Sequence, residues 1–113
     1  MAIETDPGCL EELSLAGNKL TLLHRAAFHR LPRLRRVELS DNQIRSFHSE
    51  AFSDTPLVEE LLLANNRINR VTDVSFMIDS LPYLRFLDLS RNLISDIPYG
   101  ALRGYPALER LYL

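Results

Sequence analysis

Apolar residues recur at fixed intervals along the chain. Each repeated unit has apolar residues at its first, fourth, sixth and eleventh positions and Asn at its ninth. Four complete units and the start of a fifth begin at Leu10, Leu34, Val58, Leu84 and Leu108. These starts are 24 residues apart, except for the 26 residues between Val58 and Leu84. The fourth and sixth positions alternate with variable ones, which predicts a short β-strand in every unit.

A strand that returns every 24 residues or so indicates a solenoid, in which successive strands are parallel and about 4.8 Å apart in one sheet. The apolar positions would face inward and be covered by the neighbouring coils. Beyond each strand, Arg25–Arg30 and Ser49–Ser53 are compatible with helix, and Tyr99–Gly104 looks like a turn. We therefore expect short helical turns or coil on the convex side.

The ninth position forms a column of Asn residues where the chain leaves each strand. A buried turn at this point leaves backbone groups without partners. An Asn side chain both donates and accepts hydrogen bonds, so a stacked series can satisfy those groups. The pattern predicts this structural role for Asn18, Asn42, Asn66 and Asn92.

The unit resembles the leucine-rich repeat, L-x-x-L-x-L-x-x-N-x-L, over residues 10–113. It is similar to the typical subclass, which is frequent in extracellular receptors and matrix proteins. The resemblance implies an α/β solenoid shaped as a horseshoe arc, with a concave parallel sheet and about four and a half repeats. We expect one domain, 1–113, with repeats 10–33, 34–57, 58–83, 84–107 and a partial repeat 108–113, excised from a longer array.

Charge and composition exclude several classes of function. The net charge of −2 gives no electrostatic case for binding nucleic acid or an anionic membrane. The longest apolar run, Leu61–Ala64, is too short for membrane insertion. Cys9 is the one cysteine, so no internal disulfide forms; it is either a small buried residue or the remnant of a disulfide in a missing cap.

The residue types offer little for catalysis. His24 and His48 hold the same position in adjacent repeats, but two ligands without a third make a poor metal site. No nucleophile and base arrangement or phosphate-binding glycine loop is evident. The sequence therefore predicts a protein that is not an enzyme and needs no cofactor.

The outward-facing strand positions carry a regular charge pattern. The second positions read Glu11, Arg35, Glu59, Arg85 and Glu109, and the third read Glu12, Arg36, Glu60, Phe86 and Arg110. Each acid is expected beside a base of the next coil, where a pair contributes about 0.2–1 kcal/mol. The pairs either hold the register of the stack or form a charge-patterned docking surface.

Leu62, Phe86 and Tyr112 would lie diagonally across three strands as an apolar patch on this charged face. Such patches mark interaction sites, unless an adjoining segment covers them. The predicted concave ligand-binding residues are Arg36, Glu38, Glu60, Leu62, Arg85, Phe86, Asp88, Arg91, Arg110 and Tyr112.

Together these features predict a protein–protein interaction module that recognises a macromolecular ligand on its concave sheet. The resemblance favours an extracellular receptor, adhesion or matrix protein. The alternative is a cytoplasmic scaffold or regulatory subunit, which the single cysteine and the absence of a signal peptide and of an Asn-x-Ser/Thr sequon favour. The last strand, Leu108–Leu113, has an unprotected edge, and if the chain is complete we expect self-association through it.

Overall fold

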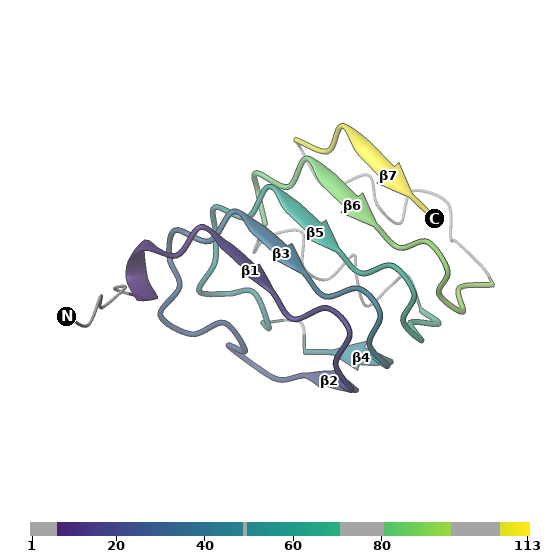
Figure 1. Cartoon of the computed structure of the whole chain (residues 1–113). Helices are drawn as coiled ribbons and strands as arrows, with labels where there is room; N and C mark the ends of the chain where they lie inside the picture. The colour runs from purple at the N-terminus through teal and green to yellow at the C-terminus, as the bar shows by residue number, and fades with distance from the viewer. Residues whose placement is uncertain (1–6, 49, 71–80, 96–106) are drawn as a thin grey trace.

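The computed structural model describes residues 7–48, 50–70, 81–95 and 107–113. Its main element is a parallel sheet in which the strands follow one another in chain order (Figure 1). The strands are β1 (Glu12–Ser14), β3 (Arg36–Glu38), β5 (Glu60–Leu62), β6 (Phe86–Asp88) and β7 (Arg110–Tyr112). This arrangement confirms the predicted solenoid with one parallel sheet.

Equivalent positions of the repeats stand beside one another throughout the sheet. Glu12 pairs with Arg36, Arg36 with Glu60, Glu60 with Phe86, and Phe86 with Arg110. The two additional residues of the third repeat therefore do not shift the register between β5 and β6. Columns read from the sequence are real columns on the surface of the sheet.

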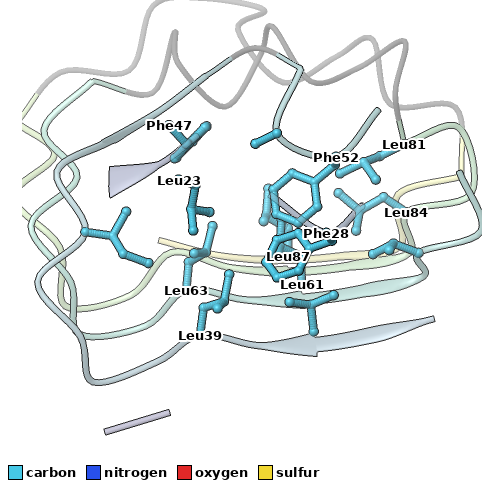
Figure 2. Close-up of a cluster of buried hydrophobic side chains, with 14 of the residues drawn as sticks. Leu23, Phe28, Leu39, Phe47, Phe52, Leu61, Leu63, Leu81, Leu84 and Leu87 are labelled. Carbon is cyan, nitrogen blue, oxygen red and sulfur yellow. The ribbon is translucent and has the colours of Figure 1, made fainter. Parts of the chain in front are cut away.

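The core lies between the sheet and the opposite side of each coil (Figure 2). The inward strand residues Val37, Leu61 and Leu87 are fully buried. Phe28 and Phe52 stack behind them with ring centroids 5.2 Å apart. Burial of each such side chain contributes about 1.5–3 kcal/mol, so the stacked coils hold one another together.

The convex side consists of turns and a second small sheet in the described residues. Strands β2 (Leu22–Leu23) and β4 (Ser46–Phe47) pair in parallel below the main sheet (Figure 1). Arg25–Arg30 forms turns, and its backbone φ is positive at Ala26 and Arg30, which interrupts any α-helix. Of the two predicted alternatives for this segment, short helical turns and coil, the structure therefore agrees with coil. Tyr99–Gly104 and Ser49 lie outside the described residues.

Three residues of the Asn column have the predicted structural role, whereas Asn18 is exposed and its side-chain hydrogen bonds among the described residues stay within its own turn. The Asn66 side-chain amide donates to the carbonyl oxygens of Leu39 and Leu63, each at 3.0 Å, and its oxygen accepts from the Ile44 amide at 3.0 Å. Asn42 and Asn92 bond in the same way. Each of these residues therefore joins its own turn to that of the preceding coil.

The two ends of the described sheet are more exposed than its middle. Cys9, in the short 3-10 helix η1 (Pro7–Cys9), is exposed, so its prediction as a small buried residue is wrong. Its sulfur is oriented toward solvent and toward Arg33 Nη1, 3.8 Å away. At the other end, Leu111 and Leu113 of the edge strand region are 36% and 54% exposed. Self-association through this edge stays a prediction.

Candidate functional site

The concave face of the sheet contains a groove of about 360 Å³ over the entrances of the strands. Side chains from five coils line it, because the second and third repeat positions project from neighbouring strands. The lining residues are Glu12, Arg35, Arg36, Glu59, Glu60, Arg85, Phe86, Glu109 and Arg110. All of the lining residues are charged except Phe86, which contributes the one aromatic ring of the lining.

The second repeat position forms a continuous ladder of ion pairs. Arg35 lies 3.9 Å from Glu11 and 3.8 Å from Glu59, and Arg85 lies 3.7 Å from Glu59 and 3.0 Å from Glu109. The hydrogen bond to Glu109 is the main cause that raises the pKa of Arg85 above its ordinary value. The predicted alternation of charge is confirmed as contacts between coils.

At the third repeat position, the described residues form an ion pair only between the second and third coils. Arg36 Nε contacts Glu60 at 3.1 Å, and Arg36 Nη2 contacts Glu38 at 3.2 Å. In the fourth coil Phe86 replaces a charged residue and the alternation ends. The guanidinium of Arg110, beside Phe86 on β7, has no ion pair with the residues that the structure describes.

Phe86 and Tyr112 form an aromatic pair at this point. Their ring centroids are 5.3 Å apart and the rings are tilted by 55°. Phe86 is half-buried, and Tyr112 is 49% exposed. The half-buried Leu62 stands two strands away from Tyr112 in the same column, with Asp88 between them. Two of the three residues predicted as an apolar patch are therefore in contact, and Leu62 lies on the adjoining strand.

The structure separates the predicted site residues into three groups. Arg36, Glu60, Arg85, Phe86 and Arg110 line the groove. Glu38, Leu62, Asp88 and Tyr112 occupy the next column of the sheet. Arg91 follows the end of β6, where φ is 55°, and it is not among the groove residues.

Asp88 was predicted as a concave ligand-binding residue, and in the structure its carboxylate is already engaged in part. Its Oδ1 accepts hydrogen bonds from the Ser90 amide at 2.9 Å and from the Ser90 hydroxyl at 2.5 Å. This carboxylate therefore stabilises the turn that follows β6, and only part of its hydrogen-bonding capacity is open to a ligand.

Sequence reasoning left out four residues that line the groove. Glu12, Arg35, Glu59 and Glu109 were predicted only as members of pairs that either hold the register or form a charge-patterned docking surface. The alternating charge columns could have identified these four residues. Every outward residue near the entrance of a strand contributes to the lining of the groove. For metal binding, the described residues include no group of three His, Cys, Asp or Glu side chains close enough to hold an ion. No helix within the described ranges is long and apolar enough to cross a membrane.

Comparison with known proteins agrees with this geometry. The family model described as leucine rich repeat matches residues 9–68 and again residues 56–113. A chain in the crystal structure of the Drosophila melanogaster SNF/U2A' complex has the same fold, with a TM-score of 0.67 and 22% sequence identity. The match covers 89% of the present chain and 58% of that chain, so the present chain spans little more than half of its length. On the family match over nearly its whole length, the chain belongs to the leucine-rich repeat family.

Proposed function

We propose that the chain is a protein-recognition module whose concave sheet binds a protein ligand. Leucine-rich repeats are typical of protein–protein interaction modules rather than of enzymes. The observation that carries the proposal is the aromatic pair of Phe86 and Tyr112 on an otherwise charged sheet. Aromatic side chains in such a position supply much apolar contact area at a small cost in side-chain entropy.

The charged groups around the pair would set the orientation of the ligand. Glu59 and Arg85 neutralise each other and their neighbours, so a ligand does not have to supply a matching charge for every coil. Arg110 lacks such a partner among the described residues and stands next to Phe86. An apolar side chain of the ligand would pack against the rings while an acceptor group meets Arg110.

The family resemblance supports a proposal for the compartment. We infer that the module belongs to an extracellular receptor, adhesion or matrix protein, because the 24-residue period is typical of that subclass. The second candidate is a cytoplasmic scaffold or regulatory subunit. One observation favours it, namely the free and exposed thiol of Cys9, which a reducing compartment protects from oxidation.

A capture experiment tests the site and the compartment together. The immobilised chain is exposed to a pool of secreted proteins and, separately, to a cytosolic lysate, and the retained proteins are identified by mass spectrometry. The site variant is Leu62→Glu with Phe86→Glu. The matched control is Leu22→Glu with Ala27→Glu, because these exposed residues lie on the convex side, outside the concave groove, and receive the same new charges.

We expect a protein from the secreted pool that the parent chain and the control retain and the site variant loses. Retention by the site variant at the level of the control would overturn the concave site. A partner retained from the cytosolic lysate alone, and lost with the site variant, would keep the site and replace the extracellular assignment with the cytoplasmic one.

A further inference from the structure

A second surface lies on the flank where the chain leaves the main sheet. The segments 15–22, 39–46, 63–70 and 89–95 run from the strand ends toward the side of β2 and β4 (Figure 1). Backbone hydrogen bonds stack them, such as Arg67 N to Ile44 O and Leu93 N to Ile68 O, both 2.9 Å. Ile44 and Ile68 are fully buried, and the residues on either side of each face outward.

The outward side chains of this flank are strongly basic. They include five cations, and the one carboxylate in the same segments is Asp41. We call this surface the basic flank, and it consists of the exposed residues Lys19, Arg45, Arg67, Arg70, Arg91 and Leu93. The chain as a whole has a net charge of −2, so the positive charge of the flank is a local feature.

The cations of the basic flank have no ion pair among the described residues, whereas three of the four groove arginines do. Arg35, Arg36 and Arg85 each contact two carboxylates. None of the five flank cations has an ion pair with a residue that the structure describes. The carboxylate of Asp41 instead accepts a hydrogen bond from Asn65 Nδ2 at 2.7 Å. The positive field of the flank is therefore available to an external anion.

Two features indicate a protein rather than a nucleic acid as the anionic partner. Leu93 is 62% exposed among the arginines, which gives an aliphatic contact that a phosphate backbone does not use. The four segments contain no aromatic ring on which a base could stack.

We propose that the basic flank is a second docking surface, for an acidic protein segment that carries an aliphatic side chain. The carboxylates of the segment would pair with Arg45, Arg67 and Arg70, and its aliphatic residue would contact Leu93. Arginine is suited to this role because its guanidinium binds carboxylates in a planar fork. Arg45, Arg67 and Leu93, which the test variants change, are neither groove residues nor predicted concave residues, so the two surfaces can be tested separately.

The test measures binding of a labelled peptide by fluorescence anisotropy at low salt. The probe is a fluorescein-labelled peptide of alternating Glu, Asp and Leu. The control probes are the same peptide with Gln and Asn in place of the acids, and single-stranded oligothymidylate of equal charge. The test variant is Arg45→Gln with Arg67→Gln. Its matched control is Arg30→Gln with Arg33→Gln, which removes the same charge from exposed positions outside the flank. A third variant is Leu93→Ser.

We expect the acidic peptide to bind the parent chain, with affinity falling about tenfold in the test variant and by less than about twofold in its control. Leu93→Ser should weaken binding of the acidic peptide and leave oligothymidylate unchanged. Absence of binding, an equal loss in both double variants, or tighter binding of oligothymidylate than of the peptide would each overturn the proposal. Circular dichroism of every variant establishes that it remains folded.

Discussion

The polar residues at the two ends of the central strands differ in what they bond to. At the strand entrances, Arg35 and Glu59 bond side chain to side chain at the surface of the groove. Beyond the strand exits, Asn42 and Asn66 are 8% and 5% exposed and bond to backbone groups of two successive coils. Both sets repeat once per coil, and both cross from one coil to the next.

The difference lies in what replaces the bonds when they are lost. An exposed ion pair is exchanged for water at little cost. A buried amide or carbonyl cannot form a replacement hydrogen bond with water. Removing its partner therefore lowers the free energy of unfolding by the desolvation penalty of that group. The Asn column therefore supports the stability of the solenoid, and the charge ladder contributes mainly to its register and to the character of its surface.

The largest effect is expected for Asn66→Ala. The Ile44 amide loses its acceptor, while the carbonyl oxygens of Leu39 and Leu63 each keep an amide donor from Asn42 or Asn92. One buried orphan donor and the lost bonds should lower the free energy of unfolding by about 2–3 kcal/mol. Urea denaturation followed by circular dichroism measures this change.

The matched control is Asn18→Ala. Asn18 is exposed and donates within its own turn, to the carbonyl oxygens of Leu15 at 2.7 Å and Ala16 at 3.4 Å. Water can replace those bonds, so the expected loss is below about 1 kcal/mol. Equal losses in the two variants would show that burial between coils is not what makes the column important.

A smaller effect of opposite sign is expected for Arg91→Gly. The residue before each Asn of the column has a positive φ, as Gly17, Asp41, Asn65 and Arg91 show with 72°, 59°, 55° and 55°. The left-handed conformation strains an Arg backbone and suits Gly. The free energy of unfolding should rise by about 0.5–1 kcal/mol in urea denaturation.

Arg45→Gly provides the contrast, because Arg45 is exposed in the same flank but is not among the residues with positive φ. There Gly adds only conformational entropy to the unfolded chain, which should destabilise the protein by about 0.5–1 kcal/mol. A loss of stability in Arg91→Gly would contradict the strain at that turn.

The sheet, its register and the Asn column could be predicted because they depend on periodicity alone. A residue such as Leu61 has the same surroundings in every coil, so its position in the unit defines its burial. The convex side follows no such rule. The positive φ of Ala26 and Arg30, which breaks the helix, has no signature in residue types that otherwise favour helix.

One part of the candidate site could be predicted from the same periodicity, and another part could not. The column positions place Phe86 and Tyr112 side by side, and the ring contact follows. The sequence did not indicate that Asp88 bonds to Ser90 or that Arg91 stands beyond the strand, since both depend on the local path of the turn. The exposure of Cys9 likewise depends on how the chain enters the first coil, where no repeat pattern applies.

The smallest effect is expected for Arg36→Gln, which tests the ladder side of the comparison. Arg36 contacts Glu60 at 3.1 Å and Glu38 at 3.2 Å, and its side chain is 37% exposed. Loss of both pairs should lower the free energy of unfolding by about 0.5 kcal/mol at low salt, and by less at about 1 M salt, where surface charges are screened. Arg67→Gln is the control, because Arg67 is exposed and has no ion pair among the described residues. The difference in free energy of unfolding between this variant and the parent chain should not change with salt. A loss in Arg36→Gln as large as that in Asn66→Ala would mean that the ladder, like the Asn column, holds the coils together.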